Sequence, residues 1–143
     1  MAKTASAPKD TKEHRRVIVA EDEALIRLDI VETMKENDFD VVGEAADGEE
    51  AVTLALELEP DLIVMDIKMP KLDGIAASEK IMKEAPCAIV MLTAFSDKEL
   101  IERAKDAGTM AYLVNPFDPK DLLPAVEVAL SRHQELLSLE DSI

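Results

Sequence analysis

The stretch that decides the fold runs LIVMDIKMPKLDG, from Leu62 to Gly74. Residues 62–65 form an apolar run that Asp66 ends, which is typical of a strand buried on both faces of a parallel sheet. The proline and the Asp-Gly pair that follow indicate a loop leading into a helix. Because open α/β sheets bind ligands at the carboxyl ends of their strands, Asp66 stands where a functional residue is expected.

The same pattern extends outward in both directions. Apolar runs predict strands at 17–20, 41–45, 62–65, 88–92 and 110–114, and helical patterns predict helices at 24–37, 49–58, 75–84, 96–107 and 118–140. The first helix should carry two neighbouring apolar stripes, one of Ala24, Leu28 and Val31 and one of Ile26, Ile30 and Met34. Strands and helices that alternate five times predict a doubly wound α/β domain with a parallel sheet.

Two helix boundaries have specific signals. Ser96 and Glu99 have the spacing of a capping box, which predicts the start of the fourth helix. Gly108 suits the left-handed position that ends the same helix. Asp22 can either cap the first helix or act as a ligand, and the sequence leaves both roles open.

Length and charge narrow the class of protein. The 143 residues suit one domain, and the single cysteine excludes an internal disulfide. Residues 1–16 carry a net charge of +3, and we interpret them as a flexible basic arm. Because the whole chain has a net charge of −15, residues 17–143 have a net charge of −18. Such an acidic body repels phosphate backbones, so we expect no nucleic-acid binding by this domain. With no transmembrane or secretory pattern, we expect a cytoplasmic protein that does not bind membranes.

Polar residues follow the predicted strands. Glu21 and Asp22 follow the first, Asp66 the third, Thr93 the fourth and Asn115 the fifth. If the first and third strands are neighbours, three carboxylates converge on one small cleft. Like charges at such distances need a cation, and hard oxygen ligands favour Mg²⁺ or Mn²⁺.

These residues carry a family resemblance. The acidic pair Glu21-Asp22, the segment MDIKMPKLDG, Thr93 in MLTA and the segment YLVNPF stand in the order found in receiver domains of two-component response regulators. The chain resembles that family over 17–131. The resemblance implies a flavodoxin-like fold with strand order 2-1-3-4-5, a histidine kinase as partner and no enzymatic turnover beyond the domain's own phosphorylation and dephosphorylation.

The resemblance also implies roles for individual residues. Asp66 would be the phosphoacceptor, Thr93 would turn inward to bind the phosphoryl group, and Tyr112 would change rotamer together with Thr93. The implied Mg²⁺ ligands are the carboxylates of Glu21, Asp22 and Asp66 and the backbone carbonyl of Lys68.

One position departs from the family pattern. Asn115 stands where the family has a lysine that pairs with the phosphoryl oxygens, which fits either an atypical receiver or a deliberate substitution. An alternative function is therefore a pseudo-receiver, a binding module not regulated by phosphate. A less favoured alternative is a hydrolase of the haloacid dehalogenase type, which has a second aspartate where this chain has Lys68.

The last predicted helix is longer than the sheet can cover. Residues 132–143 should extend it as a linker or a coiled-coil seam, and a homodimer would form through this helix or through the helix–strand–helix face around Tyr112. The body resembles receivers of antiterminator-type (ANTAR) regulators most, in segments such as GEAADGEEAV and SRHQELLSLE. RNA binding would belong to an output domain. Since the residues after the last predicted helix are too few to form one, we expect an isolated receiver or a single-domain regulator.

Overall fold

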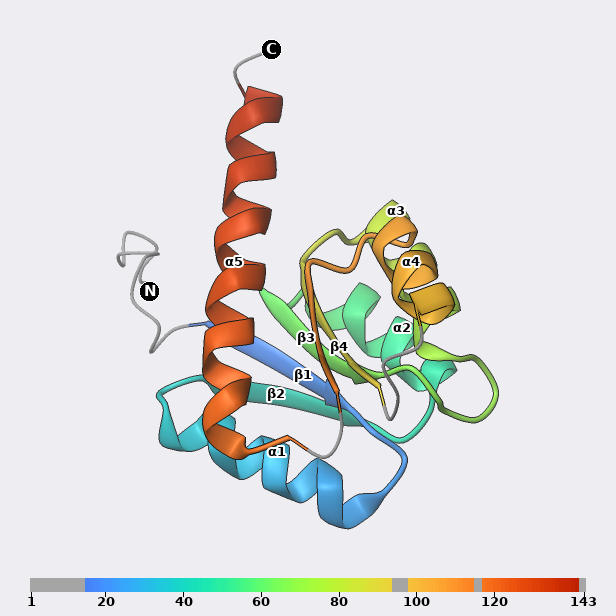
Figure 1. Ribbon diagram of the computed structural model, residues 1–143, viewed down its shortest axis with the longest axis vertical. Coiled ribbons are helices and arrows are strands. Elements are labelled where there is room, and N and C mark those ends of the chain that lie inside the picture. The colour runs from blue at the N-terminus through green and yellow to red at the C-terminus, as the bar shows by residue number, and fades with distance from the viewer. Residues whose placement is uncertain (1–14, 94–97, 115–116, 142–143) are drawn as a thin grey trace.

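The predicted alternation of strands and helices is confirmed. The computed structural model describes residues 15–93, 98–114 and 117–141 (Figure 1). Over these residues the elements are β1 (Arg16–Ala20), α1 (Ala24–Glu36), β2 (Asp40–Ala45), α2 (Gly48–Leu58), β3 (Leu62–Asp66), α3 (Gly74–Glu84), β4 (Ala88–Thr93), α4 (Lys98–Asp106), β5 (Ala111–Val114) and α5 (Pro119–Asp141).

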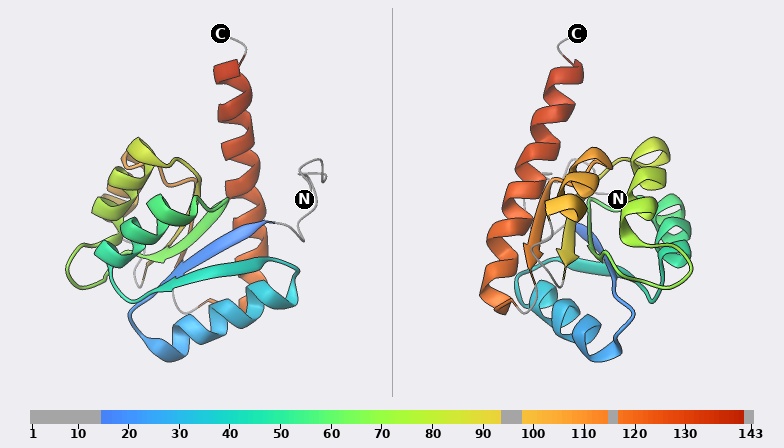
Figure 2. Two further views of the ribbon diagram at one scale, coloured as in Figure 1. Left: turned by 180° about the vertical axis from the view of Figure 1, so that it is seen from behind. Right: turned by 45° about the vertical axis from the view of Figure 1, so that its right-hand side comes forward.

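The strands form one parallel sheet in the order β2-β1-β3-β4-β5, as predicted. Helices cover both faces, with α1 and α5 on one side and α2, α3 and α4 on the other (Figures 1 and 2). Strand side chains alternate between two apolar clusters. Ile18 and Ile63 pack toward α2, α3 and α4, whereas Val17, Val19 and Val64 pack toward α1 and α5.

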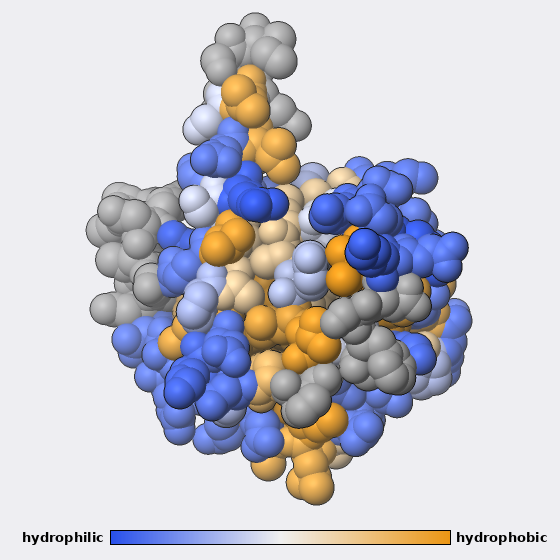
Figure 3. Space-filling model, viewed as in Figure 1, coloured by the Kyte–Doolittle hydropathy of each residue, from blue (hydrophilic) through white to orange (hydrophobic). Residues whose placement is uncertain are grey.

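Helix α5 extends past the sheet. Its first half packs on the sheet through Leu122, Val126 and Ala129, which are fully buried. Its second half projects from the body, where apolar side chains are visible in the space-filling view (Figure 3). These side chains, which are between 42% and 62% exposed, are Leu136, Leu137 and Leu139. No helix among the described residues is long and apolar enough to cross a membrane.

The expected stripes of α1 are partly wrong. Ile30, Val31 and Met34 are buried, but Ala24 and Leu28 face solvent, Leu28 with 51% exposure. The packed face of α1 runs through Ile26, Ile30, Val31 and Met34, and Ala24 and Leu28 lie outside the apolar cluster that this face joins. Helix α1 is preceded by Glu23 at its N-cap, without a side-chain capping bond, and not by Asp22.

Helix α4 ends as expected, whereas its start is not tested. Gly108 follows the helix with a φ of +102°, a backbone conformation that favours glycine. The Ser96 capping position lies outside the described residues.

The N-terminus of α2 supports the loop that follows β3. Asp47 caps α2 by accepting a 2.8 Å hydrogen bond from the Glu50 N–H, and its other oxygen lies 3.7 Å from Lys71 Nζ. Gly48 contacts the same loop so closely that a Cβ there would lie 1.8 Å from the carbonyl oxygen of Leu72. The loop can therefore close only over a residue without a side chain.

We predict that Gly48→Ala destabilises the protein by about 1–3 kcal/mol or more, because backbone must move to admit the methyl group. The matched control is Gly43→Ala in β2, where the new Cβ would lie 3.3 Å from the flexible Leu58 side chain. That change should alter the free energy of unfolding by less than about 1 kcal/mol. Urea unfolding measures the free energy of unfolding of both variants. Equal losses of stability in the two would contradict the close contact between Gly48 and the Leu72 carbonyl.

Candidate functional site

Parallel pairing of β1 with β3 brings the acidic residues together. Ala20 pairs with Met65, so Glu21 and Asp66, one residue further along each strand, lie side by side at the carboxyl edge of the sheet. The carboxylate oxygens of Glu21, Asp22 and Asp66 lie within 4.8 Å of one another. The predicted convergence of these three residues is therefore present in the structure.

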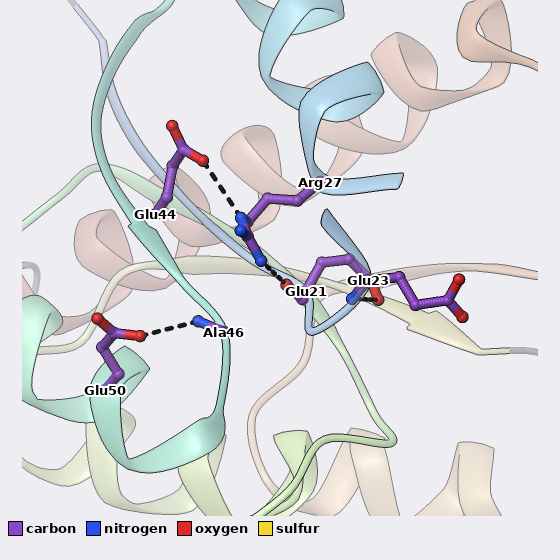
Figure 4. A network of polar contacts seen from close by, with 6 residues as sticks. All are labelled: Glu21, Glu23, Arg27, Glu44, Ala46 and Glu50. Carbon is purple, nitrogen blue, oxygen red and sulfur yellow. Dashed lines mark hydrogen bonds and ion pairs between the residues drawn. The ribbon is translucent and has the colours of Figure 1, made fainter. Parts of the chain in front are cut away.

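Glu21 is the most enclosed member of the acidic cluster. It is 1% exposed, and its backbone N–H donates to the Ala45 carbonyl at 2.9 Å. Its Oε2 accepts a 2.9 Å hydrogen bond from the Glu23 N–H (Figure 4), whereas its buried Oε1 has no hydrogen-bond partner among the described residues. Burial, together with the charges of Asp66 and Asp22, raises the pKa of the Glu21 carboxyl to about 7.

Asp66 is partly buried at the end of β3. Burial and the charge of Asp22 raise the pKa of its carboxyl to about 6, although a hydrogen bond from the Lys68 backbone N–H acts in the opposite direction. The loop after Asp66 turns back at once, because the Gly74 N–H donates to the Ile67 carbonyl at 2.7 Å. A Cβ at Gly74 would lie 2.3 Å from the Asp66 carbonyl oxygen, so glycine is required for this turn.

The acidic cluster fits a hard divalent cation. Its three side chains offer only oxygen ligands, which Mg²⁺ and Mn²⁺ prefer. The Glu21 Oε1 atom is a buried acceptor that lacks a donor among the described residues, and the pKa values of Glu21 and Asp66 are raised mainly by burial and further by neighbouring negative charge. A cation bound there would give Glu21 Oε1 a partner and offset the negative charge of the cluster.

A cavity of about 770 Å³ opens beside the acidic cluster, between α1 and α5. The cluster and Lys68 line one part of it. The apolar lining comes from Ile26 and Ile30 of α1, from Leu122 of α5 and from Phe117 and Pro119, which precede Leu122 in the chain.

Thr93 and Tyr112 lie on the opposite side of the sheet from this cavity. Asp66 pairs with Leu92, so Thr93 is one residue further along the neighbouring strand, and it is 3% exposed. Tyr112 pairs with Met91 and is 42% exposed. Because side chains alternate along strands, Tyr112 and Thr93 share one face of the sheet. Asn115 lies outside the described residues.

Two contributors to the site are absent from the sequence-based prediction. Gly74 carries a usable signal, the Asp-Gly pair in the segment after Asp66, but that signal predicts only a turn. Arg27 carries none. Its guanidinium contacts the Glu21 carbonyl and the Glu44 side chain, an arrangement that depends on how α1 packs beside β2 (Figure 4).

Comparisons with known proteins agree on one family. The family model described as the response regulator receiver domain matches residues 17–127. The transcriptional regulatory protein PdtaR of Mycobacterium tuberculosis is 54% identical over 129 residues, which are 90% of this chain and 63% of PdtaR. The chain thus spans less than two thirds of that relative.

Solved structures show the same fold. The response regulator domain of Thermotoga maritima CheB superposes with a TM-score of 0.76 at 33% identity, covering 82% of this chain and 96% of that one. A chain in the CheX–CheY–BeF₃–Mg²⁺ complex from Borrelia burgdorferi superposes with a TM-score of 0.75 at 27% identity. The match covers 78% of this chain and 86% of that one.

The acidic cluster should make the stability of the metal-free protein depend on pH. The pKa values of Glu21 and Asp66 rise from 4.5 and 3.8 to about 7 and about 6 in the folded state. The folded protein therefore holds protons that the unfolded chain has released, and the free energy of unfolding falls as the pH rises toward 7. Glu21→Gln should flatten this fall, whereas Glu36→Gln on the exposed side of α1 should not. Urea unfolding with a chelator present measures the slope, and identical slopes in wild type and Glu21→Gln would contradict this linkage.

Proposed function

The chain belongs to the family of response regulator receiver domains of two-component systems, and we propose that it accepts a phosphoryl group on Asp66. The observation that carries this proposal is the convergence of three carboxylates at the carboxyl edge of the sheet, within 4.8 Å of one another. Asp66 is the member that ends the central strand β3, and it borders the cavity through which a donor can approach.

The proposed reaction is a transfer from a phosphohistidine of a histidine kinase. A carboxylate oxygen of Asp66 forms a bond to phosphorus, the phosphorus–nitrogen bond breaks, and the imidazole leaves with that electron pair. Glu21 and Asp22, with the backbone carbonyl of Lys68, would hold Mg²⁺ or Mn²⁺ together with Asp66. Such an ion, when bound, offsets negative charge on the phosphoryl oxygens. We propose that the domain also promotes its own phosphorylation and dephosphorylation, with no other substrate.

The enclosed position of Glu21 supports its role as a ligand. Its Oε2 is fixed by the Glu23 N–H, so Oε1 is the atom left to face a cation. The raised pKa of Asp66 has a second consequence: without a cation, part of the Asp66 population is protonated near neutral pH and cannot act as a nucleophile. Neutralisation of the cluster therefore prepares the carboxylate for attack.

We propose that Thr93 and Tyr112 transmit the change. Thr93 stands at the end of the strand next to Asp66, and Tyr112 lies one strand further on the same face. Strand β5 is the edge of the sheet, and Tyr112, Val114 and Val128 are partly exposed there. This face, with α4 and α5, would bind a partner or a second copy of the chain. The exposed leucines of α5 are the other candidate surface for a homodimer.

The wider setting is also proposed. A histidine kinase that uses cytoplasmic ATP would place the protein in the cytoplasm. The resemblance to antiterminator-type receivers suggests a regulator that acts on RNA through an output domain. The receiver itself, with its acidic body, is not proposed to touch nucleic acid.

Asn115 favours a second candidate function, a pseudo-receiver that binds a partner without phosphorylation. A neutral amide in place of a lysine removes one positive charge from the predicted phosphoryl site. A hydrolase of the haloacid dehalogenase type has less support, because Lys68 stands at the position of its general acid.

A small phosphodonor with Mg²⁺ should add one phosphoryl group to the wild-type protein, and Asp66→Asn should abolish the addition. The matched control is Asp106→Asn on the exposed surface of α4, which should be modified like wild type. Intact-protein mass spectrometry measures the addition, and hydroxylamine should remove the group because an acyl phosphate is labile. Unmodified wild-type protein would favour the pseudo-receiver, and modification of Asp66→Asn would show that another residue is the acceptor.

Asn115→Lys should strengthen binding of beryllofluoride, a phosphoryl analogue, in the presence of Mg²⁺. A lysine ammonium attracts the negative analogue, whereas Asn115 offers only a neutral donor. We expect a gain of about tenfold, or roughly 1.4 kcal/mol, together with larger spectral changes at Thr93 and Tyr112. Titration followed by NMR measures both. Equal binding by the two proteins would mean that Asn115 replaces the lysine without consequence.

A further inference from the structure

Arg27 links three elements at the edge of the acidic cluster. It lies in the first half of α1, and its side chain is only 20% exposed. Its Nη1 donates a hydrogen bond to the backbone carbonyl of Glu21, and its Nε donates at 3.2 Å to Oε1 of Glu44 in β2 (Figure 4). One guanidinium thus joins α1 to the end of β1 and to the edge strand.

These contacts fix the backbone on both sides of Glu21. The Glu21 N–H is held by the Ala45 carbonyl at 2.9 Å, and the Glu21 carbonyl is held by Arg27. The peptide group that follows Glu21 is planar, so the direction of its carbonyl fixes the position of the Asp22 Cα, from which the Asp22 side chain starts. The Glu23 N–H then closes the turn on the Glu21 carboxylate at 2.9 Å.

The guanidinium does not serve as a counter-ion for the cluster. Its hydrogen bonds go to a main-chain carbonyl and to Glu44, which is 52% exposed and stands outside the group of three carboxylates. A positive charge this close to a cation site weakens cation binding by Coulomb repulsion. Arg27 therefore contacts the cluster through its backbone, while its charge acts against cation binding.

We propose that Arg27 is a positioning residue for the metal and phosphoryl site: by holding the Glu21 carbonyl, it keeps the Glu21 and Asp22 carboxylates aimed at Asp66. The inference rests on the proposed function, because it assigns Arg27 to the same cation-binding cluster. Arginine suits this task better than lysine, since a planar guanidinium donates in two fixed directions at once.

The direction in which Arg27→Met changes Mn²⁺ affinity separates the positioning role from a purely electrostatic one. If Arg27 affects the site only by its charge, Arg27→Met should tighten Mn²⁺ binding. If Arg27 positions the ligands, the same variant should weaken Mn²⁺ binding by about tenfold or more, in the range typical of groups that orient metal ligands. The probe is Mn²⁺ alone, with free ion counted by electron paramagnetic resonance.

Three further variants of the full chain complete the test. Arg27→Lys keeps the charge but should also bind Mn²⁺ more weakly, so the positioning role can be tested even if Arg27→Met fails to fold. Glu44→Gln should change Mn²⁺ affinity less than Arg27→Met, because the contact with the Glu21 carbonyl remains. Lys35→Met, an exposed change on the same helix, should not weaken binding.

A second measurement needs no metal. In the metal-free protein, the Glu23 amide should exchange hydrogen faster in Arg27→Met than in wild type, because the turn that holds its hydrogen bond to the Glu21 carboxylate is released. Mn²⁺ binding by Arg27→Met that equals or exceeds that of wild type, with unchanged Glu23 exchange, would overturn the role of Arg27 and leave the proposed function intact. Failure of the wild-type protein to bind Mn²⁺ would overturn both.

Discussion

Mutual repulsion among three carboxylates governs how this site is built. Glu21, Asp22 and Asp66 offer oxygens within 4.8 Å of one another, and burial adds to the repulsion by removing water. Such an arrangement is unfavourable by itself, so the remainder of the fold has to hold it in place. The sheet does most of this, because β1 and β3 are paired in parallel and packed between two apolar clusters, which opposes separation of their ends. A bound cation would relieve the repulsion without any change in this scaffold.

Local contacts aim the side chains that the sheet brings together. Gly74 lets the chain turn back directly over the Asp66 carbonyl, and Gly48 lets the same loop rest on the N-terminus of α2. On the other side, Arg27 holds the carbonyl between the two acidic residues that follow β1. Each of these contacts acts on the backbone and not on a carboxylate. The oxygens are thereby left available for a cation and a phosphoryl group, which is what a phosphoacceptor site requires.

The sequence predicts the strands well, because hydrophobic period determines them. The strand order comes from the family resemblance, and with β1 beside β3 the position of each acidic residue at a strand end predicts the convergence of the carboxylates. The errors of the sequence-based prediction have a common physical origin in tertiary surroundings. Ala24 and Leu28 fit a helical stripe, yet they face solvent because α1 packs on the sheet through Ile30, Val31 and Met34. Arg27 has no local signal, since its partners Glu21 and Glu44 come from other elements. Thr93 and Tyr112 share one face of the sheet, and the roles of these residues and of Asn115 stay predictions.

The three carboxylates are proposed to act as one cation site that prepares Asp66 for phosphoryl transfer. The decisive measurement is a carbon-detected NMR titration of the side-chain carboxyl groups, with and without saturating Mg²⁺. Without Mg²⁺ we expect Glu21 to titrate near pH 7 and Asp66 near pH 6, and we expect Mg²⁺ to lower both pKa values. Ordinary carboxyl pKa values that Mg²⁺ leaves unchanged would contradict a shared cation site.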